Sequence, residues 1–203
     1  MSAPDDPLDL HVERMRAGDE DAMRVVYRDV QPRLLRYLTV MVGVADAEDV
    51  ASETWAQAFR DLDRFAGDAD GFRGWITTIG RHRALDHLRR RQRQPVGDLD
   101  LMELLDRPTG EDVEGLVLDA VGTQDALRML AGLPRDQAEA ILLRTVLGFD
   151  APTAARILGK RPGAVRSAAH RGLRALARQL EDPEKNVRPT RDTSPEPDAE
   201  GLR

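Results

Sequence analysis

The stretch from Phe72 to Arg93 places the strongest constraint on the fold, because its apolar residues recur at helical rather than strand spacing. That spacing predicts one buried stripe along an amphipathic helix. The stripe consists of Phe72, Ile76, Ile79, Ala84 and Leu88. The opposite ridge consists of His82, Asp86, Arg89 and Arg93, with Arg83 and Arg90 beside it. Such a basic ridge suits a nucleic-acid backbone, and the alternative is a solvated charged end of a helix.

Composition favours an all-α fold of two small helical domains. Of the 203 residues, 33% are charged and only 4% are aromatic, so we expect small cores of Leu, Ala, Val and Ile. The formal net charge of -6 argues against a general nucleic-acid coat protein. Because the chain has no cysteine and only four scattered histidines, we expect no disulfide and no metal site built from thiolate or clustered histidine ligands.

The charge is distributed unevenly along the chain. From Arg81 to Arg93 six arginines accompany one acid, Asp86, whereas from Pro95 to Asp125 nine acids accompany one base, Arg107. Those acids are Asp98, Asp100, Glu103, Asp106, Glu111, Asp112, Glu114, Asp119 and Asp125. Since Gly and Pro also interrupt this stretch, it predicts an acidic flexible linker over residues 95–122.

The two ends of the chain have no helical periodicity. Residues 1–7 predict a disordered leader, and the tail 181–203 is rich in Pro and charge and predicts disorder as well. The first residues contain no basic region followed by an apolar core, and no apolar run approaches the length of a membrane span. We therefore expect a cytoplasmic protein without membrane insertion.

Residues 8–94 predict a first helical domain. Its first helix ends at Gly18, Asp19 caps a second, Pro32 opens a third, and Asp46 caps a fourth. In the fourth helix Trp55 and Phe59 lie on the apolar stripe and are expected to be core residues. Its opposite face carries Glu48, Asp49, Ser52, Glu53 and Gln57. The Gly- and Asp-rich segment 65–71 predicts a loop before the basic helix, which Pro95 ends.

Residues 123–180 predict a second domain that ends in a helix-turn-helix. Asp150 is expected to cap one helix, and Pro162 begins the next after a turn of Gly159, Lys160 and Arg161. We expect Val165, Ala169, Leu173 and Leu176 to face inward. The outward residues are Arg166, Ser167, His170, Arg171, Arg174 and Arg178. Small residues near the start of this helix favour close approach to base edges, and the alternative is a helical hairpin with a charged outer face.

From Val25 to Leu180 the sequence resembles the extracytoplasmic-function (ECF) sigma factors, the small two-domain initiation subunits of bacterial RNA polymerase. The residues that carry the resemblance are DAEDVASETWAQAF, DRFAGDADGFRGWI, RHRALDHLRRR, and finally LPRDQAEAILLRTVLGF with ILGKRPGAVRSAAHRGLRAL. The resemblance implies a promoter-specificity subunit with core RNA polymerase and promoter DNA as partners. It implies no catalysis, no cofactor, no metal and no small-molecule substrate. Many members of the family also have an inhibitory anti-sigma factor.

The resemblance also implies roles for residues in the first domain. The acidic helix docks on the polymerase through Asp46, Glu48, Asp49, Glu53 and Gln57. The loop 66–71 and the basic helix capture the non-template strand of the melted upstream element. The strand-contacting residues are Arg73, Thr77, Arg81, His82, Arg83, Arg90 and Arg91. Two alternatives stay open: Trp75 is a core residue rather than a stacking platform, and His82 bonds to Asp86.

In the second domain the resemblance implies recognition of the distal promoter element in duplex form. The implied contacts are Lys160, Arg161, Arg166, Ser167, His170, Arg171 and Arg174. Where the family commonly has an apolar residue after the turn glycine, this chain has Lys160. Several commonly larger residues are alanine here, so we expect a thinner contact between the two helices. The linker is expected to thread through the polymerase cleft.

Two other functions compete with this hypothesis. A helix-turn-helix repressor or activator would bind duplex operator alone, but it leaves the acidic helix and the basic helix without a role. An enzyme acting on nucleic acid could bind a metal through Asp46, Glu48 and Asp49, but these acids have no partner histidine and no Gly-rich phosphate loop.

Overall fold

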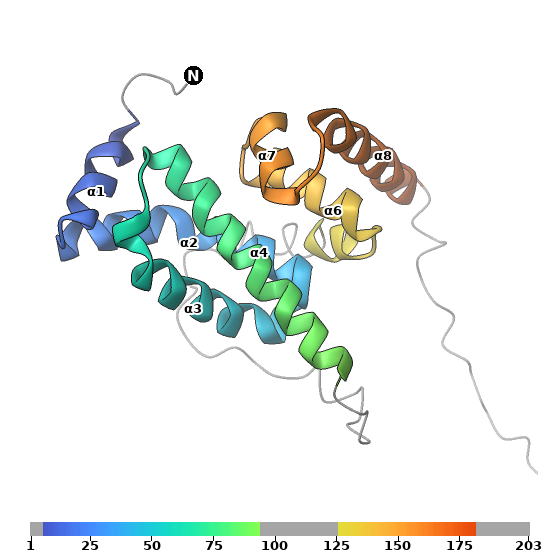
Figure 1. Cartoon of the computed structure of the whole chain (residues 1–203). Coiled ribbons are helices and arrows are strands. Elements are labelled where there is room, and N and C mark those ends of the chain that lie inside the picture. Colours follow the sequence, from blue (N-terminus) through green and yellow to red (C-terminus); the bar gives the residue numbers. More distant parts are fainter. Residues whose placement is uncertain (1–5, 94–125, 182–203) are drawn as a thin grey trace, which may run out of the picture.

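The computed structural model describes residues 6–93 and 126–181, and both ranges are helical (Figure 1). The first contains α1 (Pro7–Arg16), α2 (Glu20–Val42), α3 (Val44–Arg60), the short η1 (Leu62–Arg64) and α4 (Ala69–Arg93). The second contains a short helix at 126–131, α6 (Arg135–Ile141), the π-helical turn η2 (Leu142–Val146), α7 (Ala151–Leu158) and α8 (Pro162–Glu181). The predictions for residues 1–5, the linker 95–122 and the tail beyond 181 lie outside the described residues.

Side-chain caps set where the first two helices begin. The Asp6 carboxylate accepts a hydrogen bond from the Leu8 amide, and Asp19 accepts from the amides of Asp21 and Ala22. The predicted cap at Asp19 is therefore confirmed. Because Asp6 caps α1 and Pro7 is its first residue, the predicted disordered leader extends too far into the chain.

α2 is one continuous helix, so the prediction that Pro32 opens a separate helix is wrong. Proline lacks the amide hydrogen that a helix interior uses, and its presence there normally costs stability. The helix continues because Val26, Val30, Leu34 and Leu38, on both sides of the proline, are buried in the same core.

The start of α3 also differs from expectation. Gly43, at a φ of 92°, precedes the helix without any side-chain cap, so the predicted cap at Asp46 is wrong. Asp46 instead lies in the first turn of α3, and its carboxylate accepts a hydrogen bond from Arg91 of α4 at 2.7 Å. The last residues of the predicted loop 66–71 are helical, because α4 begins at Ala69.

The core of the first domain lies where α2, α3 and α4 meet. On α4, Phe72, Ile76 and Ala84 are buried as the stripe predicts, while Ile79 and Leu88 are partly buried. On α3, Trp55 is buried, but Phe59 is 38% exposed and is not a core residue. Aromatic rings form a continuous cluster, in which Trp55 neighbours Tyr27, Phe59 and Phe72, and Trp75 neighbours Phe65 and Phe72.

The second domain contains the predicted helix-turn-helix. The Asp150 carboxylate accepts a hydrogen bond from the Thr153 amide at 2.7 Å, and Gly159 ends α7 in the left-handed conformation at a φ of 63°. α8 packs on α6 at Gly172, where an added Cβ would lie 2.6 Å from Cδ1 of Ile141. The inward face therefore runs through Gly172, and the prediction that Leu173 faces inward is wrong because its side chain is 49% exposed.

The two domains touch each other (Figure 1). α2 contacts α6 and η2, and α4 contacts α7. Within the described part of the chain, no helix has both the length and the hydropathy that crossing a bilayer requires.

Candidate nucleic-acid interface

The outer face of α8 is open to solvent along the residues predicted to contact duplex DNA. Arg166, Ser167, His170, Arg171 and Arg174 are all exposed, as are Lys160 and Arg161 in the turn. Arg171 lies 3.7 Å from the Asp136 carboxylate, and an ion pair on an exposed surface is weak. These seven side chains are therefore available to phosphate and base edges without rearrangement of the fold.

The first turn of α8 leaves room for close approach to a ligand. A Cβ added to Gly163 would meet no atom within 4 Å, and Ala164 beside it is exposed. The amides at a helix N-terminus point outward and, with the helix dipole, attract phosphate. The start of α8 thus combines the positive end of the helix dipole, small side chains and the flanking cations Lys160 and Arg161.

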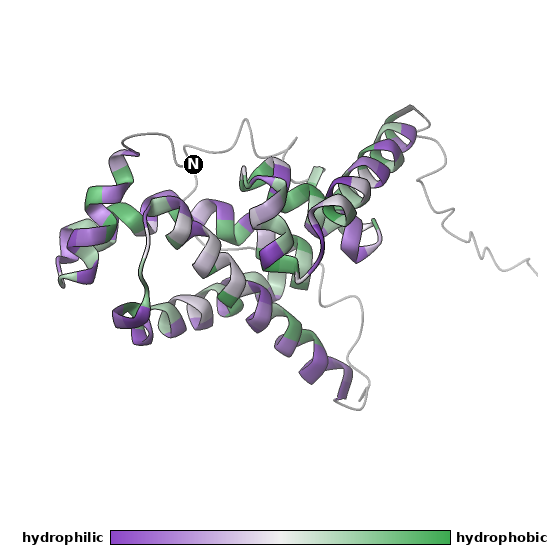
Figure 2. Cartoon of the chain, turned by 45° about the horizontal axis from the view of Figure 1, so that its top comes forward, coloured by the Kyte–Doolittle hydropathy of each residue, from purple (hydrophilic) through white to green (hydrophobic). Residues whose placement is uncertain are grey.

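The C-terminal part of α4 has a different environment, although its last turns are almost wholly hydrophilic (Figure 2). Arg83 donates a hydrogen bond to Gln57, and Arg90 lies 3.4 Å from the Glu53 carboxylate. Arg91 donates to Asp46, as described above. Three residues predicted for the melted strand are thereby paired with three residues predicted for the polymerase.

The two histidines of α4 differ in exposure. His82 is exposed, and the alternative in which it bonds to Asp86 is wrong, since no hydrogen bond or ion pair joins these two described residues; the Asp86 carboxylate accepts from Arg89 at 2.8 Å. His87, which sequence reasoning did not single out, lies with Nε2 3.1 Å from the Asp46 carboxylate. The ridge of His82, Asp86, Arg89 and Arg93 is exposed, as predicted.

Arg73 is held at the start of α4 by three carboxylates. Its guanidinium lies 2.5 Å from Asp6, 3.0 Å from Asp29 and 3.0 Å from Asp70, and only 15% of the side chain is exposed. Burial alone would lower the pKa of Arg73, but the hydrogen bonds that Arg73 donates to Asp6 and Asp29 outweigh it and raise that pKa above its ordinary value. Arg73 therefore ties α1 and α2 to α4 in this arrangement.

Thr77 and Arg81 lie at the contact between the domains rather than on an open surface. Thr77 is 1% exposed, and its hydroxyl donates to the carbonyl of Arg73 at 2.6 Å. Arg81 donates from Nε to Glu139 of α6 at 2.8 Å, and the hydroxyl of Tyr37 donates to the same Oε1 at 3.2 Å. DNA contact by Thr77 or Arg81 stays a prediction, and it requires the domains to separate.

Sequence reasoning missed Glu139 and Tyr37. Glu139 is 3% exposed, and Tyr37 is fully buried. Burial, followed by the nearby Glu139 carboxylate, raises the pKa of the Tyr37 hydroxyl well above its ordinary value, so this hydroxyl keeps its proton and donates. One local signal could have found Glu139: in the sequence it is flanked by the apolar residues Ala138, Ala140 and Ile141. A charged side chain buried among apolar residues needs a partner of opposite charge or a hydrogen bond.

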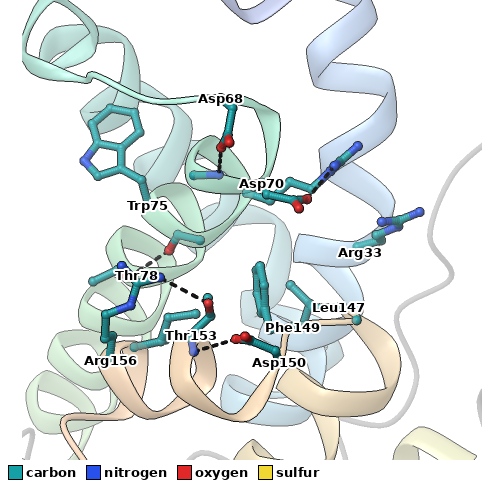
Figure 3. Close-up of a pocket in the computed structure, with 15 residues that line it drawn as sticks. Arg33, Asp68, Asp70, Trp75, Thr78, Leu147, Phe149, Asp150, Thr153 and Arg156 are labelled. Atoms are coloured by element: carbon teal, nitrogen blue, oxygen red, sulfur yellow. Dashed lines mark hydrogen bonds and ion pairs between the residues drawn. The ribbon is translucent and has the colours of Figure 1, made fainter. Parts of the chain in front are cut away.

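A polar cleft of about 780 Å³ lies between the domains (Figure 3). Trp75 and Thr78 of α4 form one wall, and Thr153 and Arg156 of α7 form the other. Trp75 lines the cleft and also packs against the buried rings of Phe65 and Phe72, so its side chain makes contact with the core. In residues 6–93 and 126–181 no group of three or more His, Cys, Asp or Glu side chains could hold a metal ion.

Comparison with known proteins finds a family match for each of the two helical domains. The family model for Sigma-70 region 2 matches residues 26–94, and the model for Sigma-70, region 4 matches residues 123–176. The chain is 34% identical over 176 residues to the ECF RNA polymerase sigma factor BldN of Streptomyces coelicolor, and the match covers 84% of this chain and 65% of BldN.

Two further relatives extend the comparison. The ECF RNA polymerase sigma factor SigD of Mycobacterium tuberculosis is 30% identical over 186 residues, which cover 89% of this chain and 87% of SigD. The fold resembles the sigma factor RpoE of Bartonella quintana in complex with the anti-sigma factor NepR, with a TM-score of 0.59 and 24% identity over 78% of this chain and 96% of RpoE. The chain therefore belongs to the ECF RNA polymerase sigma factors, a non-enzymatic family that acts in transcription initiation.

Proposed function

We propose that this sigma factor divides recognition of the -10 and -35 promoter elements between its two domains. α8 reads the -35 element as duplex, with Arg166, Ser167, His170, Arg171 and Arg174 toward the bases and phosphates and with Lys160 and Arg161 on the backbone. α4 and the segment before it capture the non-template strand of the melted -10 element, which needs no bond cleavage. The same protein joins core RNA polymerase in the bacterial cytoplasm.

The observation that carries this proposal is the exposure of the whole predicted reading face of α8. A helix-turn-helix places its second helix in the major groove, where arginine makes bidentate contacts to guanine. Duplex binding alone would also suit a repressor. The match to Sigma-70 region 2 over residues 26–94 favours the initiation factor, because a repressor has no use for that domain.

For polymerase docking, the outer face of α3 offers two acids that no other described side chain engages. Glu48 and Asp49 are exposed, and neither forms an ion pair with any residue in 6–93 or 126–181. Asp46, Glu53 and Gln57 are also on this face, but they hold arginines of α4. We assign first contact with the polymerase to Glu48 and Asp49.

The remaining parts of the proposal concern the linker and an inhibitor. The acidic linker 95–122 follows the polymerase cleft, because its charge resembles that of the nucleic acid which the cleft accepts. Since the similar RpoE was solved with an anti-sigma factor, we propose an anti-sigma factor as a partner of this chain as well.

Co-elution with core polymerase tests the docking surface. In the variant with Glu48→Lys and Asp49→Lys, we expect polymerase affinity to fall by about tenfold or more, because like charges then face the partner. The matched control is Glu13→Lys with Asp63→Lys, which changes the net charge equally at exposed acids outside α3. Unchanged co-elution of the α3 variant, with native circular dichroism, would show that polymerase docks elsewhere.

A further inference from the structure

We propose that the described arrangement is a closed, self-inhibited state in which the second domain covers the strand-capturing part of α4, and that Tyr37, Arg81 and Glu139 form the latch that holds it. The proposal rests on the proposed function, because it concerns the residues assigned to the melted strand. It adds a regulatory state that the isolated chain adopts without an inhibitor protein.

The latch joins three side chains that are distant in sequence. Arg81 of α4 and Tyr37 of α2 both donate to Oε1 of Glu139 on α6, at 2.8 Å and 3.2 Å. The side chain of Arg81 is 16% exposed and that of Glu139 is 4% exposed. Water therefore screens this ion pair little, and each charge depends on the other while the domains touch.

The second domain also covers the neighbouring turn of α4. Leu147 and Phe149, in the segment between η2 and α7, are buried, and they enclose a small cavity together with Leu34 and Thr77. Thr77 and Arg81 are four residues apart on one face of α4. In the closed state neither side chain can reach a DNA strand.

Beyond these contacts the interface opens into the polar cleft of Figure 3. Charged side chains line it from both domains, including Asp70 and Arg73 on one side and Asp150 and Arg156 on the other. A hydrated cleft of this kind contributes little apolar burial to the contact. The latch and the Leu147 and Phe149 contact therefore carry most of the domain association, which suits a contact that opens during use.

Promoter geometry requires the opening. The -10 and -35 elements lie about 80 Å apart along duplex DNA, taking roughly 3.4 Å for each base pair. Each domain of this size has a radius of gyration of only about 12 Å, so two domains in contact cannot reach both elements. Residues 94–125 connect the domains, and a chain of that length can extend to about 100 Å. The closed state is therefore inactive, and the open state is sterically allowed.

An engineered disulfide tests the closed state directly, because the natural chain has no cysteine. A Cβ added to Gly74 of α4 would lie 3.7 Å from Cγ2 of Thr153 of α7, close enough for a bridge after a small adjustment. In the full-length variant with Gly74→Cys and Thr153→Cys, we expect an intramolecular disulfide. We expect the oxidised protein with core polymerase to melt promoter DNA at least about tenfold less than the reduced protein.

The rate of disulfide formation in the isolated protein then tests the latch. Adding Glu139→Gln leaves the buried Arg81 without a charged partner only in the closed state, so bridge formation is expected to slow by about tenfold. Adding Asp136→Asn instead, on the same helix but outside the latch, leaves the rate unchanged. Tyr37→Phe is expected to slow the rate less than Glu139→Gln does, because it removes a neutral donor.

The outcomes separate this inference from the proposed function. Failure of the bridge to form, an equal rate in the Glu139→Gln variant, or full promoter melting by the oxidised protein each contradicts the closed state. If the wild-type protein does not direct polymerase to a promoter, the proposed function fails, while the rates measured without polymerase still decide whether the latch exists.

Discussion

α4 and α8 are both rich in arginine, with seven arginines on α4 and four on α8, yet the fold places these side chains in different environments. On α8 the predicted DNA contacts are exposed, and among them only Arg171 forms an ion pair within the described residues, at 3.7 Å. On α4, Arg73, Arg81, Arg90 and Arg91 all pair with carboxylates, and Arg83 bonds to Gln57. A helix that is rich in arginine therefore need not present arginines that are free to bind DNA.

The difference corresponds to the two forms of DNA that a promoter presents. Duplex exists before the protein arrives, so α8 can bind without rearrangement. Melted strand exists only after the duplex opens, and α4 must then exchange internal partners for phosphates and bases. We infer that this exchange ties strand capture to domain opening, since Arg81 stays paired with the buried Glu139 until the domains separate. The side chains of Arg90 and Arg91 are exposed, so their ion pairs with Glu53 and Asp46 are weak and phosphates can replace them.

The largest expected effect is on α8. Replacing Arg166 and Arg171 by Ala is expected to weaken binding at the -35 element by about a hundredfold, because a good base or phosphate contact contributes about 1–3 kcal/mol. Footprinting of the polymerase complex measures this loss. Arg178→Ala, on the same helix beyond the proposed contacts, is the control. A normal footprint from the double variant would show that α8 does not read the -35 element.

A smaller expected effect concerns stability, and it compares an arginine of α4 with an arginine of α8. Arg73→Ala is expected to lower the free energy of unfolding of the first domain by about 1–3 kcal/mol, since three carboxylates lose their shared partner. Arg174→Ala on α8 is expected to cost about 0.5 kcal/mol or less, as for other exposed positions. Urea unfolding followed by far-ultraviolet circular dichroism compares them. Equal costs would mean that Arg73 is not a structural tie.

The smallest effect is on acid stability at two helix caps. Bonds from the Leu8 amide and Arg73 lower the pKa of Asp6, and the Thr153 amide lowers that of Asp150, from an ordinary value of 3.8. A carboxyl with a lowered pKa stabilises the fold above the ordinary pKa, and this contribution is lost as pH falls through the lower, folded value.

Asparagine also caps helices but does not titrate in this range. Asp150→Asn is therefore expected to reduce the loss of thermal stability between about pH 7 and about pH 3 with little change at neutral pH. Asp6→Asn is expected to cost more at neutral pH, because it also removes a charge from Arg73. Identical behaviour of the two variants at neutral pH would argue that the Asp6 to Arg73 pair contributes nothing.

Local signals predicted the second domain well. The Asp150 cap, the left-handed Gly159 and Pro162 at the start of α8 act within a few residues, so the sequence alone locates the helix-turn-helix. The inward face of α8 was less predictable. A stripe through Leu173 and one through Gly172 differ by a single residue, and the close approach of Ile141 at Gly172 decides between them.

The pairing on α4 could not be predicted from spacing. Arg81 and Glu139 are 58 residues apart, and Tyr37 and Glu139 are 102 apart, so only the packing of whole domains brings them together. The same holds for Arg73, whose partners are Asp6, which caps α1, and Asp29 on α2. Charge pattern located the basic helix, but it could not show which of its cations are already paired.

The most direct test is a single assay of strand opening, in which permanganate reactivity of promoter thymines is measured with core polymerase and the double-cysteine protein. The account predicts reactive thymines at the -10 element with the reduced protein, none with polymerase alone, and a loss of at least about tenfold after oxidation. Equal reactivity of the oxidised and reduced proteins, in a sample where the disulfide is complete, would contradict it.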